Sequence, residues 1–215
     1  MSDEHDAPQE GSPPQDEPSA AGGPTSQEIR HTQISARVPE RVARGVFSTG
    51  AVVLQGAHEF IVDFLLRMTQ PQQVAARVVL PPAVMARFIA ALRENLAAHD
   101  RNFGPPPPPP AQPRPPAGQS QTSVQDLYDA LKISDDVVSG TYANAVMIGH
   151  TASEFSFDFI TTFFPRSAVS ARVYLSAPNV PRFLESLIHS FDQYQRKLAE
   201  QQRRPPDRLR PPESL

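Results

Sequence analysis

The most constraining feature of this sequence is that it repeats itself. When the chain of 215 residues is shifted by 95 positions, residues 45–100 align without a gap on residues 140–195, and 14 of these 56 pairs are identical. Gly45 aligns with Gly140, and conservative pairs such as Phe47 with Tyr142 are frequent. The sequence therefore predicts an internal duplication, with two copies of one small domain.

Proline-rich segments separate and flank the two copies. The chain has 25 prolines and 10 glycines, and the prolines gather in 13–24, 105–116 and 205–212. We expect a disordered acidic tail over residues 1–28, repeat 1 over 29–104, a linker over 105–121, repeat 2 over 122–200 and a basic tail over 201–215. The linker is either a stiff polyproline tether or a docking peptide for an aromatic-lined groove. The basic tail either keeps the chain in solution or binds an acidic partner or phosphate.

Within each copy, apolar residues alternate with polar ones in the manner of half-buried strands. The segments 59–66 and 154–160 place phenylalanines on one face and charged or polar residues on the other, and 74–80 and 169–175 do the same around Arg77 and Arg172. The preceding segments 45–55 and 140–150 are rich in β-branched and aromatic residues, as strands are.

Each run of strands ends at prolines and continues with helical periodicity. Met85, Phe88, Ile89 and Leu92 form one apolar stripe, and the second copy has an equivalent stripe that begins at Val180 and continues through Phe183, Leu184 and Leu187. The predicted fold class is α+β, with two tandem β-β-β-α or β-β-β-β-α repeats, each an antiparallel sheet covered by one helix. The pattern leaves the presence of a fourth strand open. The motif phenylalanines Phe60, Phe64, Phe155 and Phe159 are expected in the core against the helices.

Each predicted sheet has a second face without a helix to cover it. In repeat 1 this face carries Ile61, Leu65 and Val79, which are apolar. Small units with such a face usually bury it against a partner. We therefore expect repeat 1 and repeat 2 to pack through these faces as a pseudo-two-fold pair, and a homo-oligomer is a further arrangement that the sequence allows.

Upstream of Gly45 we expect the two copies to differ in length. The tripeptide QIS at 33–35 resembles KIS at 132–134, which is an offset of 99 rather than 95. This match predicts four extra residues in the first copy before Gly45.

Acidic residues recur at equivalent positions in both copies. Glu59 and Asp63, with their equivalents Glu154 and Asp158, are spaced as a pair of carboxylates, but four residues along a strand span about 13 Å. That separation exceeds the roughly 5–9.5 Å of glycosidase carboxylates. If the loop after the strand centres near Gln70, Asp63 lies opposite Arg77, and Asp158 opposite Arg172. We therefore predict cross-strand ion pairs rather than acid–base catalysis.

No catalytic or metal-binding pattern emerges from the remaining residues. His150 with Glu154 and Asp158 could be drawn as a metal trio, but the three are spread along a hairpin and the chain has no cysteine. His58, His99 and His189 are isolated and are expected at the surface or at helix edges. No phosphate-binding glycine loop or nucleophile elbow is present. We expect no enzyme activity, no metal and no cofactor.

Composition indicates a cytoplasmic protein. The first residues are acidic and proline-rich, unlike a secretory signal, and no apolar run is long enough to cross a membrane. The net charge of −3 gives no general basicity of the kind that nucleic-acid-binding proteins show.

The second copy resembles a family of small bacterial proteins known only as a domain of unknown function. The family pattern G-x-YAN, H-[ST], EF-x-x-DF and R-[IV] matches Gly140, Tyr142, Asn144, His150, Glu154, Phe155, Asp158, Phe159 and Arg172. The first copy keeps EF-x-x-DF and Arg77 but has Phe47-Ser48-Thr49 in place of YAN. The resemblance covers both copies, implies the fold and implies no activity.

Two functional interpretations remain. The first is a non-catalytic protein-interaction or assembly module with an unknown protein partner. The second is a single-stranded nucleic-acid-binding protein, since the order of strands and helix resembles that of PUR-type repeats. The second interpretation requires a basic, aromatic sheet face, and we favour the first because repeat 2 is acidic and the motif phenylalanines suit a core.

Overall fold

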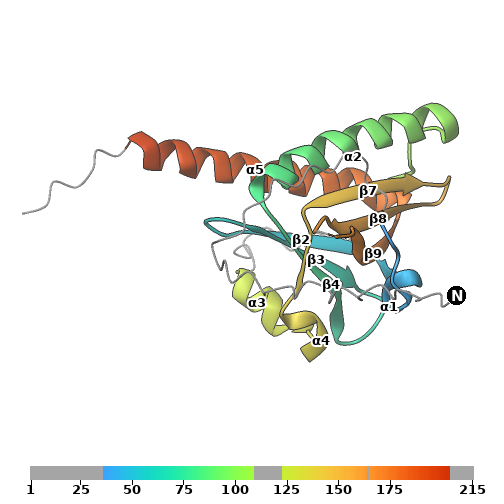
Figure 1. The fold of residues 1–215 in the computed structure, drawn as a ribbon, viewed down its shortest axis with the longest axis horizontal. Coiled ribbons are helices and arrows are strands. Elements are labelled where there is room, and N and C mark those ends of the chain that lie inside the picture. The colour runs from blue at the N-terminus through green and yellow to red at the C-terminus, as the bar shows by residue number, and fades with distance from the viewer. Residues whose placement is uncertain (1–35, 109–122, 164, 204–215) are drawn as a thin grey trace, which may run out of the picture. The chain divides into compact units, whose positions relative to one another are not determined.

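A computed structural model describes residues 36–108, 123–163 and 165–203 (Figure 1). Repeat 1 contains α1 (Glu40–Ala43), β1 (Val46–Ser48), β2 (Gly50–Gln55), β3 (Phe60–Leu66), β4 (Gln72–Leu80) and α2 (Pro82–Phe103). Repeat 2 contains α3 (Val124–Asp129), β5 (Leu131–Lys132), α4 (Asp135–Val138), β6 (Thr141–Tyr142), β7 (Ala145–His150), β8 (Glu154–Thr161), β9 (Ala168–Ser176), a 3₁₀ turn (Ala177–Asn179) and α5 (Val180–Arg203). The fold is α+β.

The two repeats exchange their first strands. One sheet has the order β1-β9-β8-β7, so that β1 of repeat 1 lies beside β9 of repeat 2. The other sheet has the order β2-β3-β4-β5, and β6 of repeat 2 also pairs with β4. The exchanged strands run parallel to their partners, whereas the three strands of each repeat are antiparallel. The fourth strand thus exists, but each sheet is mixed and not antiparallel throughout, because its edge comes from the other repeat.

The registers of the two exchanges are equivalent. Val46 pairs with Val173 in one sheet, and Thr141, which is the counterpart of Val46, pairs with Val78 in the other. Such reciprocal pairing is that of a two-fold symmetric pair.

The same symmetry corrects the expected insertion before Gly45. Arg37 forms a parallel bridge to Ala168, and Lys132 pairs in the same way with Gln73. Arg37 and Lys132 are 95 residues apart, so the duplication continues upstream without a gap. The prediction of four extra residues was wrong, since the likeness of QIS to KIS does not reflect equivalent backbone positions. QIS itself lies outside the described residues.

A glycine with positive φ directly precedes each exchanged strand, β1 and β6. Gly45 has φ of 64° and Gly140 has φ of 72°, a region that residues with a Cβ rarely adopt. A Cβ on Gly45 would also lie 2.6 Å from a ring carbon of Tyr174. The identity of these two glycines in the duplication therefore has a backbone cause, because each allows the chain to turn into the opposite sheet.

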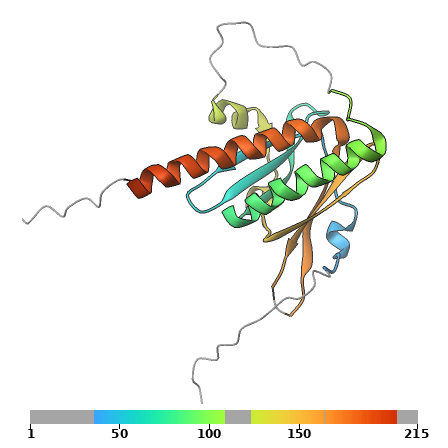
Figure 2. The same cartoon turned by 90° about the horizontal axis from the view of Figure 1, so that it is seen from above.

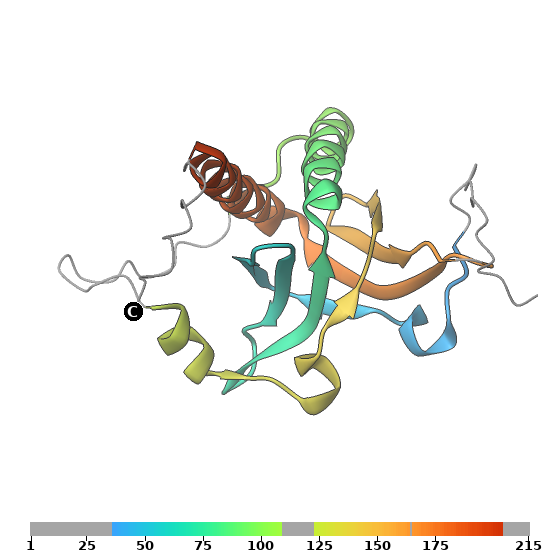
Figure 3. The same ribbon diagram turned by 60° about the vertical axis from the view of Figure 1, so that its left-hand side comes forward.

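The long helices also cross between the repeats. Helix α2 packs against β7 and helix α5 against β2, and the two helices contact each other (Figure 2). Figure 3 shows the two long helices on one side of the strands and the short helices α1, α3 and α4 on the other side. Each sheet is therefore covered by the helix of the opposite repeat. The sequence predicted one helix for each sheet, but it assigned to each sheet the helix of its own repeat.

One core serves both repeats. Phe60, Phe64, Phe155 and Phe159 are fully buried, as predicted, and belong to a single cluster with Phe88, Leu92, Phe183 and Leu187. The ring of Phe64 lies 5.5 Å from that of Phe183, and the ring of Phe88 lies 5.8 Å from that of Phe159. Both contacts join different repeats, so neither repeat has a complete core by itself.

The faces through which the repeats meet differ from the expectation. They meet through the phenylalanine faces and the exchanged strands. The face that carries Ile61 and Val79 meets repeat 2 through Tyr128 of α3, whose hydroxyl donates to Asp63 on that face. The N–H of Ala143 donates to the carbonyl of Val79 at 3.0 Å, which continues the pairing of the exchanged segment along the edge of β4. Leu65, which the sequence also placed on this face, is fully buried.

The described residues bear on only part of the predicted organisation. Helix α5 continues to Arg203, beyond the predicted end of repeat 2 at residue 200. The tail over 1–28, most of the linker and the basic tail from residue 204 lie outside the described residues. None of the helices in the described segments has the length and apolar character needed to cross a membrane.

Candidate functional site

The acidic motif residues form ion pairs with the arginines of the next strand. Asp63 lies opposite Arg77 in the register, and Nε and Nη2 of Arg77 donate to its two carboxylate oxygens at 2.8 Å each. Asp158 and Arg172 repeat this arrangement at 2.6 and 2.7 Å. These are the cross-strand pairs expected from the sequence.

Each arginine also holds the exchanged segment of the other repeat. Nη1 of Arg77 donates to the carbonyl of Val138 at 3.0 Å, and Nη1 of Arg172 donates to the carbonyl of Ala43 at 3.3 Å. Both carbonyls lie at the ends of the equivalent helices α4 and α1. The ion pairs therefore help to hold the exchanged segments in place. This structural role accounts for their presence in both copies without a catalytic role.

The two ion pairs differ in their surroundings. Asp63 is completely buried, and the hydroxyl of Tyr128 on α3 donates a hydrogen bond to it. Burial and then this hydrogen bond raise the pKa of Tyr128 above its ordinary value. The hydrogen bond with Asp63 likewise raises the pKa of Arg77, and that with Asp158 raises the pKa of Arg172. The side chain of Asp158 remains 16% exposed.

The other acidic motif residues lie at the hairpin turns. Oε1 and Oε2 of Glu59 lie over Gly56, and the N–H of Gly56 donates to the carbonyl of Glu59 at 2.8 Å. In repeat 2, the N–H of Thr151 donates to the carbonyl of Glu154 at 2.9 Å. Glu59 and Glu154 are thus placed at turns, whereas Asp63 and Asp158 are each engaged by an arginine.

Histidines lie together at one end of the core. The ring of His150 stacks on Phe155 at 5.2 Å, and His99 lies 5.7 Å from His150. His99 is 2% exposed and lies beside His150, so the prediction of an isolated residue at the surface or at a helix edge was wrong for His99. His99 is equivalent to Tyr194 in the duplication. His99 packs on Phe155, and Tyr194 packs on Phe60, so each contacts the motif phenylalanine of the other repeat.

Within the described ranges, His, Cys, Asp and Glu form no group of three or more that could hold a metal ion.

The family-matching residues have backbone roles. Oδ1 of Asn144 accepts hydrogen bonds from the N–H and the hydroxyl of Thr162 at 2.8 and 3.0 Å. Thr49 replaces it in repeat 1, and its hydroxyl accepts from the N–H of Arg67 at 2.9 Å. Repeat 1 therefore lacks the YAN sequence but keeps the hydrogen bond from the backbone N–H of the equivalent residue, Arg67, to the side chain at this position. Tyr142 is 43% exposed and stacks on Phe163 at 5.9 Å.

A groove runs along strand β2. Its cavity of about 630 Å³ is bounded by β2 from Ala51 to Gln55, by one face of α5 and by Val124 at the start of α3. The helix residues on it are spaced at helical intervals and are polar: Ser186, His189, Ser190 and Gln193. Nε2 of Gln55 donates to Oε1 of Gln193 at 3.2 Å across the groove, and Oε1 of Gln55 is buried without a hydrogen-bond partner among the described residues.

The sequence did not indicate this groove. Its helix comes from one repeat and its strand from the other, so no local pattern joins them. The sequence does contain a row of polar residues beside the apolar stripe of α5. This row indicates a groove only when β2 is known to lie next to it.

The comparison with protein-family models identifies both copies. A model described as a protein of unknown function, DUF3467, matches residues 2–105 and again residues 113–202. No curated protein and no solved structure matches the chain. The chain therefore belongs to the DUF3467 family and carries its domain twice.

Proposed function

We propose that this chain is a non-catalytic peptide-binding module, in which an extended segment of a partner protein adds as a strand to β2 in the groove beside α5. The observation that carries this proposal is the free edge of β2. This strand is the last in its sheet, and it has a strand neighbour only on the β3 side among the described residues.

The edge offers hydrogen-bonding groups in a regular order. The N–H of Gly56 donates to the carbonyl of Glu59, and antiparallel pairing alternates between bonded and non-bonded residues. Counting back from Gly56, the backbone groups of Ala51, Val53 and Gln55 point away from β3. An added strand would pair with these groups, as in other proteins that bind peptides by strand addition.

The groove walls suit an extended backbone. The side chains of Ala51 and Val53 pack on the core, while the polar face of α5 lies opposite. Hydroxyl, imidazole and amide groups on that face can bond to the polar groups that an extended peptide presents. An exposed strand edge of this kind can pair with other chains and cause aggregation, and proteins usually protect such edges. A bound peptide would occupy this edge.

Support for binding rather than chemistry comes from the motif residues. The carboxylates of Asp63 and Asp158 are engaged by arginines, and the shared motif serves the exchange of strands. The nucleic-acid alternative requires aromatic rings exposed on a sheet face. Phe60, Phe64, Phe155 and Phe159 are all buried, and they therefore offer no stacking surface to bases.

The test is a selection of binding peptides followed by a backbone scan. The full chain is screened against a synthetic library of short peptides with free C-termini, and the affinity of a selected peptide is measured by fluorescence anisotropy. Methylating its backbone nitrogens one at a time should weaken binding at every second position, because alternate N–H groups face β2. Losses spaced three or four residues apart would instead indicate a bound helix.

A matched pair of variants locates the site. His189→Trp fills the groove and should abolish binding, whereas Glu94→Trp places the same ring at the equivalent position of α2 and should leave binding unchanged. Equal effects of the two substitutions, or failure to select any peptide, would refute the proposal.

A further inference from the structure

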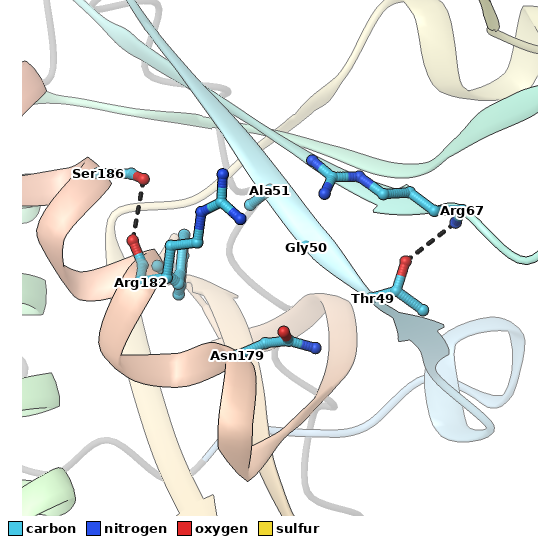
Figure 4. Close-up of a pocket in the computed structure, with 8 residues that line it drawn as sticks. Thr49, Gly50, Ala51, Arg67, Asn179, Arg182 and Ser186 are labelled. Carbon is cyan, nitrogen blue, oxygen red and sulfur yellow. Dashed lines mark hydrogen bonds between the residues drawn. The ribbon is translucent and has the colours of Figure 1, made fainter. Parts of the chain in front are cut away.

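A second, smaller cavity lies at the Gly50 end of the groove. Its volume is about 110 Å³, several times what one water molecule needs. It shares Ala51 and Ser186 with the groove, so the two are continuous. Figure 4 shows Arg67 and Arg182 on either side of the ribbon of β2 near Gly50 and Ala51, with their guanidinium groups directed toward the strand.

The two arginines bring uncompensated positive charge into this cavity. No acidic side chain lines it, and neither arginine forms an ion pair within the described part of the chain. Burial, and secondarily the charge of Arg182, lower the pKa of Arg67. Two like charges that converge in a half-enclosed space are stabilised by an anion between them.

The guanidinium of Arg67 is positioned by the strand beneath it. A Cβ on Gly50 would lie 3.4 Å from Cζ of Arg67, so the group rests on this glycine. The hydroxyl of Thr49 accepts from the N–H of Arg67 at 2.9 Å and fixes the backbone from which the side chain extends. Guanidinium groups form paired hydrogen bonds with carboxylates in a fixed geometry.

The other half of the molecule lacks this pair of charges. Arg182 corresponds to Arg87, but Arg67 corresponds to Thr162. Asn179 and Ser186 on the cavity wall correspond to Val84 and Ala91. Structural requirements of the fold are met in both halves, so the second arginine and the polar wall are not needed for folding. They distinguish the groove beside β2 from its symmetric equivalent.

We propose that the cavity with Arg67 and Arg182 binds the C-terminal carboxylate of the peptide that occupies the groove. This inference rests on the function proposed above. It also sets the direction of the peptide, because a chain that ends at Gly50 and follows the groove from Gln55 must run antiparallel to β2. The partner is therefore a protein whose free C-terminus is extended and accessible.

The test compares each selected peptide with its C-terminal amide, on the wild-type chain and on three variants. The free acid should bind about tenfold or more tightly than the amide, as for a charge-assisted hydrogen bond. Arg67→Thr, which restores the residue of the other half, and Arg182→Ala should both remove this difference. Arg87→Ala, the symmetric control, should preserve it.

The outcomes separate this inference from the proposed function. Peptides that show the alternating methylation pattern but bind equally as acid and amide would overturn the carboxylate site and leave the groove intact. A preference for the acid that survives Arg67→Thr and Arg182→Ala would also overturn it. If no peptide is selected, acetate is titrated into the full chain with the arginine Nε resonances observed by NMR, and the absence of shifts at both arginines would refute the anion site independently.

Discussion

The guanidinium of Arg77 donates two hydrogen bonds to the carboxylate of Asp63, from Nε to Oδ1 and from Nη2 to Oδ2. The same residue donates to the carbonyl of Val138 in the other repeat. One side chain thus joins two strands of its own sheet and the exchanged segment.

The two equivalent aspartates should differ in their effect on stability. Asp63→Ala leaves Arg77 facing a buried space and should cost about 3–5 kcal/mol of unfolding free energy. Asp158→Ala should cost less, about 1–3 kcal/mol, because water reaches Asp158 and Arg172. Urea denaturation of both variants measures the difference. Equal costs would show that burial of Asp63 does not strengthen its pair.

Stability should also depend on the ionisation of Tyr128 at high pH. The folded state raises the pKa of this hydroxyl, so it retains the proton at a pH where the unfolded chain loses it. The contribution is complete below the unfolded pKa of about 10 and is lost as the pH rises above it. The difference in unfolding free energy between wild type and Tyr128→Phe should therefore decrease from pH 9 upwards in denaturant titrations. A difference that is constant with pH would contradict this.

Truncation in the core should affect both repeats together. Phe64→Ala removes a ring that packs on Phe183 and Phe159, and should cost about 3–5 kcal/mol. Because the core is shared, unfolding should remain a single transition when it is followed by probes in each repeat. Two separate transitions would mean that the repeats fold independently.

Cutting the linker should not separate the halves. A protease site introduced between residues 109 and 122 would leave two fragments that still share sheets, helices and core. We expect them to co-elute on a sizing column at micromolar concentration under native conditions. Folded halves that elute separately would disprove the exchange of strands.

The sequence predicted the duplication, the fold class and the ion pairs, because each depends on a local pattern or on a count between strands. The alternation in 59–66 placed Phe60 and Phe64 inside, and the position of the loop placed Asp63 opposite Arg77. It did not predict the exchange. Val46 and Thr141 have the character of ordinary strand residues, and nothing in either segment indicates which sheet it joins.

The candidate site could not be predicted for a related reason. Arg67 directly follows strand β3, and Arg182 lies in the first turn of α5, 115 residues later. Their approach depends on helix α5 crossing to the sheet of the other repeat. The comparison of the copies held a usable signal. Arg67 aligns with Thr162 in the duplication, so the charge differs between the copies at a position where the fold accepts either residue.

The exchange of strands has a consequence for how the molecule could evolve. In a homodimer built from one such domain, every substitution appears twice, and both grooves must change together. Joining two copies in one chain preserves the intertwined architecture while allowing each gene half to accumulate its own mutations. A homodimer of identical chains would carry the same residue at both positions, so it could not have Arg67 in one half and Thr162 in the other. Fusion of the two copies in one chain is what allows selection to change one groove and leave the other as it is.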